Sequence, residues 1–288
     1  MVYGRRAPRR QVRRRGGAGR GGCARLLIAA VIAGIALFSY MGKRQYNPVT
    51  GETQAVSMTP DQEIALGVRA APEMAAQHGG LYQDARIQEQ IDAIGERLVR
   101  GTAAAQTPYR FEFHVLADER TVNAFALPGG QVFITYALLS RLETEGQVAA
   151  VLGHEIGHVV GRHSAERVAK QELMQGLTGA AVMATYDPAS GGGQMSAAMA
   201  AMVANVVQMK FGRGDELQSD RLGVEFAAQV GYDPRAAVRV MEILAEASGA
   251  GRQPEFFSTH PNPDNRIERI LQAVQEIYPN GVPASAVP

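Results

Sequence analysis

The sequence has one cysteine and no tryptophan among its 288 residues. Because Cys23 has no partner cysteine, both a disulfide within the chain and a zinc site built on several thiolates are excluded. Apolar residues make up 46% of the chain, which is enough for an ordinary globular core. The fold is therefore expected to depend on packing, with help from a bound metal.

Acidic residues are missing from residues 1–25, which carry nine of the 29 basic side chains, all of them arginines. The rest of the chain holds 20 basic and 28 acidic residues, so the net charge of +1 conceals an acidic body with a formal charge of −8. An acidic body argues against a nucleic-acid-binding core, and we expect no nucleic acid partner. Binding of nucleic acid or anionic lipid by the arginine-rich tail remains the alternative.

The arginines are followed by an apolar run from Leu26 to Met41, with Lys43 and Arg44 directly after it. A basic segment before an apolar run is typical of a secretory signal, but no site with small residues for cleavage follows. We therefore expect an uncleaved signal-anchor over residues 26–42, with residues 1–25 in the cytoplasm and the remainder exported. Cleavage at a poor site is the alternative.

The remaining chain changes from helical to strand periodicity and back. Residues 43–58 are polar and predict a linker, while residues 59–280 form the main domain and residues 281–288 a tail. The expected elements are helices over residues 59–77 and 84–99, strands near 111–115, 123–127 and 131–135, and helices from residue 136 onward. Helices around one small sheet indicate an α+β fold that is mostly helical.

One motif carries chemistry: His154-Glu155-Ile156-Gly157-His158, inside an apolar helical run. Two histidines four residues apart project from one helix face and can bind one metal ion. Zinc makes a bound water more acidic, and Glu155 can accept its proton and pass it to the leaving amine. The sequence therefore predicts a zinc hydrolase with His154 and His158 as ligands and Glu155 as the base.

The third ligand has to come from elsewhere in the sequence. A metzincin would have a histidine at position 164, where this chain has Ser164, and His163 is one residue out of register. Glu216 is the better candidate, since it starts a predicted helix 58 residues after the motif and would complete a site of two histidines and one carboxylate. Asp220, one turn later, is expected to accept the free N–H of His154.

Four motifs in this order give the sequence a specific resemblance: residues 123–130 (NAFALPGG), HEIGH followed by His163, Glu216 with Asp220, and Thr259-His260-Pro261 with Arg266. The chain resembles the HtpX/BepA-like gluzincin peptidases, relatives of the CAAX prenyl protease and the mitochondrial inner-membrane stress protease. The resemblance covers roughly residues 60–280. It implies a zincin-like metallopeptidase domain, with one zinc ion per chain and a small sheet packed on the active-site helix.

The resemblance also implies further site residues. His260 would either support the oxyanion or cap the metal as a reversible fourth ligand, and a plain loop histidine is the alternative. Arg266 would act near it, at the oxyanion or as a brace of the loop. An extended substrate would add as a β-strand beside residues of the strand and turn, where an ordinary hairpin is the alternative: Asn123, Ala124, Phe125, Ala126, Gly129 and Gly130.

These expectations combine into one functional hypothesis and one alternative. The hypothesis is a zinc metalloendopeptidase that degrades unfolded or damaged proteins of the bacterial cell envelope, anchored by one membrane segment with its catalytic domain in the periplasm. The alternative is a chaperone-like assembly factor of the envelope with a latent zinc site. Glu155 favours the enzyme, because a scaffold has no need of a base beside its metal ligands.

Overall fold

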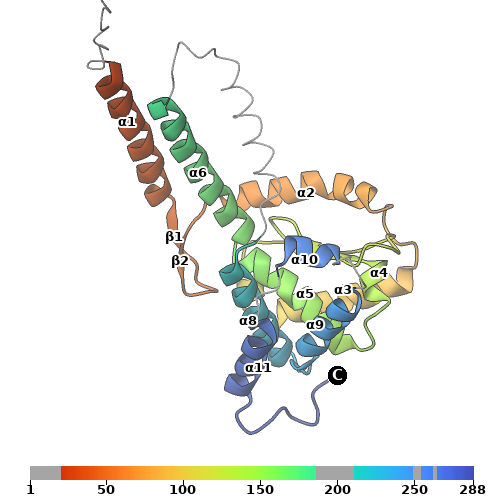
Figure 1. Ribbon diagram of the computed structural model, residues 1–288. Helices are drawn as coiled ribbons and strands as arrows, with labels where there is room; N and C mark the ends of the chain where they lie inside the picture. Colours follow the sequence, from red (N-terminus) through yellow and green to blue (C-terminus); the bar gives the residue numbers. More distant parts are fainter. Residues whose placement is uncertain (1–20, 186–210, 249–253, 262–264) are drawn as a thin grey trace, which may run out of the picture.

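The computed structural model describes residues 21–185, 211–248, 254–261 and 265–288. A body of helices and one small sheet carries two long helices, α1 (Gly21–Gly42) and α6 (His163–Thr185), which project from it side by side (Figure 1). The mostly helical α+β fold predicted from the sequence is confirmed. The arginine-rich residues 1–20 lie outside the described part of the chain.

Helix α1 is the predicted anchor, and it begins slightly earlier than the apolar run. Among the described residues it is the one helix long and apolar enough to cross a membrane, over Cys23–Gly42. A signal sequence near the N-terminus would pass the same test of length and composition, so this helix fits either an anchor or a signal. Its large apolar side chains are exposed over most of its length.

The segment predicted as a linker contains a hairpin, β1 (Arg44–Tyr46) paired antiparallel with β2 (Thr53–Ala55). Asn47 donates to the Val160 carbonyl at 2.8 Å and Gln54 donates to the Gly161 carbonyl at 2.9 Å, so the hairpin is fixed to the end of helix α5 (Glu145–Val160). Strands of three residues are too short for a visible alternation, which is why polarity alone suggested a linker.

Two helices precede the sheet. Helix α2 (Pro60–Gln77) starts with the expected capping box, in which the Thr59 hydroxyl accepts from the Gln62 N–H and the Gln62 side chain accepts from the Thr59 N–H. Helix α3 (Ala85–Arg100) is capped by Asp84 and buries Ile91, Ile94 and Leu98. A short 3₁₀ helix, η1 (Ala103–Gln106), leads into the sheet.

The sheet has three strands in the order β3-β5-β4, so β4 lies at an edge. Strand β3 (Glu112–Leu116) pairs parallel with β5 (Gln131–Thr135), and β4 (Ala124–Ala126) pairs antiparallel with β5. The three strands and the β4–β5 hairpin agree with the sequence prediction. Helix α5 (Glu145–Val160) contacts β4 and β5, so the sheet packs on the active-site helix, as the resemblance implied.

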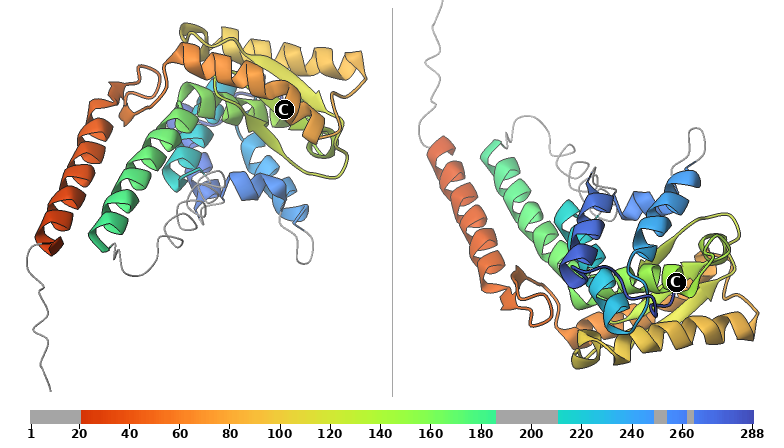
Figure 2. Two further views of the ribbon diagram at one scale, coloured as in Figure 1. Left: turned by 90° about the horizontal axis from the view of Figure 1, so that it is seen from above. Right: turned by 90° about the horizontal axis from the view of Figure 1, so that it is seen from below.

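The remaining helices surround α5, which is buried along nearly its whole length (Figure 2). Helix α8 (Arg213–Gln229) packs closely along it, α3 and α9 (Ala236–Glu246) contact it, and α11 (Arg266–Ile277) packs on α8. The C-terminal residues, predicted as a tail, are bonded to this body, since the Gly146 N–H donates to the Pro288 carbonyl at 2.9 Å. Two short helices, α4 (Tyr136–Leu139) and α10 (Glu255–Thr259), complete the described part of the fold.

Candidate metal centre

Helix α5 presents the HExxH side chains in the interior of the protein. His154, Glu155 and His158 are each at most 5% exposed. The Nε2 atoms of His154 and His158 lie 3.1 Å apart, as expected for residues four positions apart on one face. Buried polar groups need partners, so these side chains require either other residues or an ion between them.

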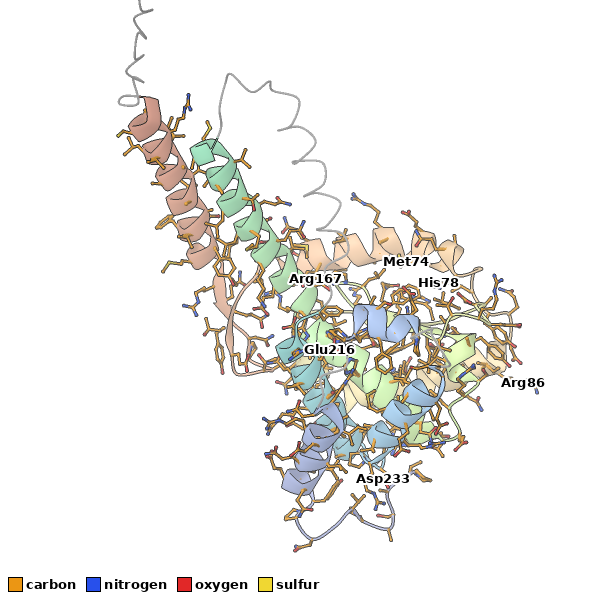
Figure 3. All side chains as sticks on the ribbon, in the orientation of Figure 1. Met74, His78, Arg86, Arg167, Glu216 and Asp233 are labelled. Atoms are coloured by element: carbon orange, nitrogen blue, oxygen red, sulfur yellow. The ribbon has the colours of Figure 1, made fainter. Side chains whose placement is uncertain are left out.

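Helix α8 supplies the carboxylate because it approaches α5 unusually closely. A β-carbon on Gly157 would lie 3.0 Å from the Ser219 α-carbon, and one on Gly153 would lie 3.2 Å from the Gly223 α-carbon. The glycines of α5 therefore allow the two helix backbones to come near contact. The approach brings the fully buried Glu216 to the histidines from the first turns of α8, where Figure 3 labels it.

A fourth donor comes from the residue after α10. His260 Nδ1 lies 3.3 Å from His154 Nε2 and 3.2 Å from Glu216 Oε1. Glu216 Oε1 is also 3.4 Å from His158 Nε2, and Glu216 Oε2 is 3.6 Å from His154 Nε2. One ligand atom from each of His154, His158, Glu216 and His260 lies within 4.8 Å of the others.

These separations fit a single metal ion. Four donors placed tetrahedrally about 2 Å from a zinc ion lie roughly 3.3 Å from one another. Five of the six donor pairs have a separation between 3.1 and 3.6 Å, which brackets that value, and the whole set lies within 4.8 Å. Histidine nitrogens with one carboxylate are also the donor types found in catalytic zinc sites.

Unpaired buried atoms give a second test of the fit. Glu155 Oε1 and His260 Nε2 are buried without a hydrogen-bond partner, and Glu216 Oε2 makes no hydrogen bond beyond its ion-pair contacts with Arg266 Nη1 at 3.2 Å and His154 Nε2 at 3.6 Å. Buried polar atoms are nearly always satisfied, and several unsatisfied atoms in one cluster are typical of a site that takes an ion or a polar ligand. The residues present therefore fit a metal.

Asp220 and Arg266 support the cluster from behind. Asp220 Oδ1 lies 2.9 Å from His154 Nδ1, the contact predicted from the sequence, so the His154 Nε2 is left to face the other donors. Arg266, only 1% exposed, donates to both Asp220 oxygens at 2.6 and 2.8 Å, and its Nη1 is 3.2 Å from Glu216 Oε2. Arg266 thus braces two carboxylates, and through Asp220 it fixes the orientation of His154.

His163 supports the second histidine of the motif. Its Nδ1 lies 2.9 Å from His158 Nδ1, and its Nε2 lies 2.8 Å from Gln218 Oε1. His163 is therefore a hydrogen-bonding neighbour and lies outside the four-donor cluster, in agreement with its position one residue out of register. The contact with Gln218 was missed in the sequence, because nothing local links residues 55 positions apart.

The charges of the site are strongly shifted by burial. Burial raises the pKa of Glu155, and the nearby His260 and His154 offset part of this rise. Burial acts in the same direction on Glu216, but hydrogen bonds with His158 and His260 outweigh it and hold the pKa of Glu216 below its usual value. Burial also lowers the pKa of His158, which favours the neutral imidazole that a metal needs.

A cleft of about 450 Å³ leads to this cluster, and His260 is part of its wall. Strand β4, helix α2 and the α10 region line it, among them Asn123, Phe125, Ala126, Met74 and His78. Figure 3 labels Met74 and His78 near the end of α2. A larger cavity of about 780 Å³ between the β1–β2 hairpin, α8 and α11 contains none of the four donors, so the smaller cleft is the relevant one.

The predicted substrate residues are divided by the structure. Asn123, Phe125 and Ala126 line the cleft, whereas Ala124 is fully buried in the core. Gly129 and Gly130 have φ angles of +85° and +110° and pack against α2 and the Arg110 carbonyl, away from the cleft lining. The turn and this packing explain both glycines, and a role in substrate binding stays a prediction for them.

Comparison with known proteins agrees with this geometry. A family model described as Peptidase family M48 matches residues 85–274. A beta-barrel assembly-enhancing protease of Yersinia pestis is 29% identical over 266 residues, 90% of this chain and 54% of that protein. The protein of the same name in Escherichia coli K12 is 28% identical over 265 residues, 90% of this chain and 53% of its own length.

A mitochondrial relative covers a larger share of its own sequence. The mitochondrial metalloendopeptidase OMA1 of Schizosaccharomyces pombe is 28% identical over 256 residues, which is 87% of this chain and 72% of that protein. The chain spans about half the length of the two bacterial relatives named above.

Proposed function

This chain belongs to peptidase family M48, and on that premise we propose that it is a zinc-dependent endopeptidase acting on unfolded segments of cell-envelope proteins. The observation that carries the proposal is the cluster of four donors with Glu155 beside it, at the wall of a cleft that an edge strand lines. A donor cluster alone would fit a structural metal site. The added carboxylate and the cleft favour catalysis.

Each residue of the cluster has a distinct role in this proposal. His154, His158 and Glu216 would hold the metal, and Asp220 and Arg266 would keep His154 and Glu216 in place. When bound, zinc makes a water more acidic and polarises the substrate carbonyl. Glu155 accepts the proton of the attacking water and delivers it to the leaving amine, for which its burial and raised pKa suit it.

His260 acts as a reversible cap on the metal in the resting protein. Its Nδ1 lies among the other donors, at the separations expected of a fourth ligand. Its Nε2 has no hydrogen-bond partner and lies 3.7 Å from Glu155 Oε1. A fourth protein ligand would occupy the position that a catalytic water needs, so we propose that the His260 ring moves aside before cleavage and then supports the oxyanion.

The substrate is an extended, unfolded segment. Within the described part of the chain, strand β4 pairs with β5 on one side only, so its other side can pair with a peptide as an added strand. Such pairing uses backbone hydrogen bonds, so binding depends on the extended conformation of the peptide more than on its side chains. Asn123 fits this use, because its Oδ1 is buried and unpartnered beside the cleft.

The cell envelope is proposed from the N-terminal helix and from the relatives. Helix α1 is suited to anchoring the chain, with the arginine-rich residues before it in the cytoplasm and the peptidase in the periplasm. Two of the relatives are named for enhancing the assembly of β-barrels. Unfolded or damaged envelope proteins are therefore the proposed substrates, including those that fail to assemble.

The same names favour a second candidate, an assembly factor whose zinc site rarely cleaves. Incubating the purified chain with unfolded casein separates the two. The peptidase should produce fragments, lose activity to a chelator and regain it with zinc, while folded substrates of the same size should remain intact. Binding of unfolded casein without any fragments, at full zinc occupancy, would favour the assembly factor.

A further inference from the structure

Helix α6 follows the active-site helix directly, with only Gly161 and Arg162 between them. It leaves the body in the same direction as α1, and the two helices lie side by side in every view (Figures 1 and 2). In the peptidase assignment only the first turns of α6 are involved, through His163 beside the cluster and Arg167 in the lining of the cleft. Its outer half therefore needs a separate explanation.

The packing of α6 on α1 is close and uses small residues. A β-carbon on Gly176 would lie 2.5 Å from the Ala36 β-carbon, so a larger residue at position 176 would separate the helices. Ala29 and Ala180, each one or two turns further along the same faces, are buried. Small residues at such spacing let helices approach closely, a feature common in membranes.

The contacts between α6 and the end of α1 also show at which residues the two helices leave the body of the protein. Lys43, directly after α1, forms an ion pair with Glu172, and the Ser57 hydroxyl donates to Glu172 at 2.7 Å. Glu172 is thus level with the end of the apolar segment Cys23–Gly42, and Gly176 is level with Ala36. Residues beyond Glu172 run along the apolar part of α1.

The charged side chains of α6 lie on the side of Glu172 nearer the body of the protein. Its charged side chains all lie in its first half: Glu166, Arg167, Lys170 and Glu172. Residues 173–185 contain no charged side chain, and their polar ones are Gln175, Thr178 and Thr185. Met174 is 55% exposed in this stretch, and on the neighbouring helix Phe38 is 81% exposed. Apolar side chains thus face outward from the pair, and none of the described residues covers them.

We propose that residues 173–185 of α6 enter the hydrocarbon core of the bilayer beside α1, so that the peptidase is held at the membrane by two helices. The inference rests on the proposed anchoring by α1. Thirteen residues extend roughly 20 Å as a helix, against about 30 Å for the hydrocarbon core, so this stretch enters the bilayer without crossing it. Lys43 and Glu172 mark the bilayer surface.

This arrangement fixes the distance of the catalytic site from the bilayer surface. His163, whose ring contacts His158, is nine residues before Glu172, which corresponds to roughly 14 Å of helix. The cleft is then close to the bilayer surface, and substrates are unfolded segments that lie near the membrane.

The absence of tryptophan makes the test direct, because one introduced tryptophan is a unique fluorescent reporter. The 288-residue chain carrying Thr178→Trp, at an exposed position of α6, is reconstituted into phosphatidylcholine vesicles with brominated acyl chains, which quench tryptophan at membrane depth. Phe38→Trp reports on α1, and Val68→Trp, on the exposed face of α2, is the control outside the bilayer. Met174→Trp is a second reporter on α6, and zinc content checks the fold of every variant.

The proposal predicts strong quenching at positions 38, 174 and 178 and none at position 68. Quenching at position 38 without quenching at 174 and 178 would overturn it while leaving the anchor intact. A lack of quenching at all positions would overturn both the anchor and the inference. Casein hydrolysis by the same vesicles measures the proposed peptidase activity separately, so its failure is distinguishable from either result.

Discussion

Gly223 in α8 lies directly against the backbone of His154 in α5. A β-carbon on residue 223 would stand 2.9 Å from the His154 nitrogen and 3.1 Å from the Gly153 carbonyl carbon. Glu216 precedes Gly223 by two turns and lies on the same face of α8. The close helix contact therefore sets how far the Glu216 carboxylate reaches toward the two histidines.

Replacing Gly223 with alanine should weaken metal binding without touching a ligand. The added methyl group meets backbone atoms that cannot rotate away, so α8 has to shift, at a cost of about 1–3 kcal/mol in the free energy of unfolding. Zinc affinity, measured by competition with a chelator, should fall as Glu216 moves out. Gly214→Ala is the control, because a β-carbon there meets nothing within 4 Å. Equal affinities for the two variants would contradict this account of the α5–α8 contact.

Glu216→Ala should remove most of the bound zinc. The variant keeps the three histidines but loses the one negatively charged donor, whose oxygens lie 3.2 to 3.6 Å from each of their nitrogens. Elemental analysis of the purified protein should fall from about one zinc per chain to a small fraction of that value. Glu225→Ala, on a more exposed part of the same helix, is the matched control. Full zinc in the Glu216 variant would exclude this residue as a ligand.

Asp220→Asn should lower zinc affinity by roughly 10–100-fold, the usual effect of removing the partner of a ligand histidine. The amide keeps the shape of the side chain but holds His154 Nδ1 less firmly, and it leaves Arg266 without its closest charge partner. Circular dichroism at saturating zinc should show an intact fold. An unchanged affinity would mean that the 2.9 Å contact with His154 does not orient the ligand.

His260→Ala distinguishes the two roles considered for this residue. If release of the His260 cap limits turnover, as we propose, the variant should keep its zinc through His154, His158 and Glu216 and should cleave casein faster than the parent, because the gain from the open site outweighs the lost oxyanion support. If it served only the oxyanion, kcat would fall roughly 10²–10³-fold with zinc unchanged. Steady-state proteolysis measured beside zinc content decides between them, and no change in either would leave His260 as a plain loop residue.

Local patterns in the sequence predicted those features that depend on neighbouring residues. The spacing of His154 and His158, the Thr59 capping box and the strand alternation around Phe113 are encoded within a few residues, and the structure contains all three features. The contact of Asp220 with His154 was also expected, because Asp220 lies one turn after Glu216 and so shares its helix face.

Contacts between distant segments were not predictable in this way. Three contacts join residues that are far apart in the sequence, by as many as 140 positions. They are the parallel pairing of β3 with β5, the hydrogen bond of His163 with Gln218, and the packing of Gly176 on Ala36. Nothing in the polarity of either partner indicates the other. The same limit applies to Gly157 and Gly223, whose importance appears only when the two helix backbones are seen in contact.

The most direct test of the proposed activity is the turnover of Glu155→Gln. Glutamine has nearly the shape of glutamate but cannot accept a proton, and residue 155 is outside the four-donor cluster. The account predicts about one zinc per chain, retained binding of unfolded casein, and hydrolysis reduced by at least about 10²-fold, the lower end of what a general base contributes. A variant that keeps its zinc and most of its turnover would contradict the assignment of Glu155 as the base of a zinc peptidase.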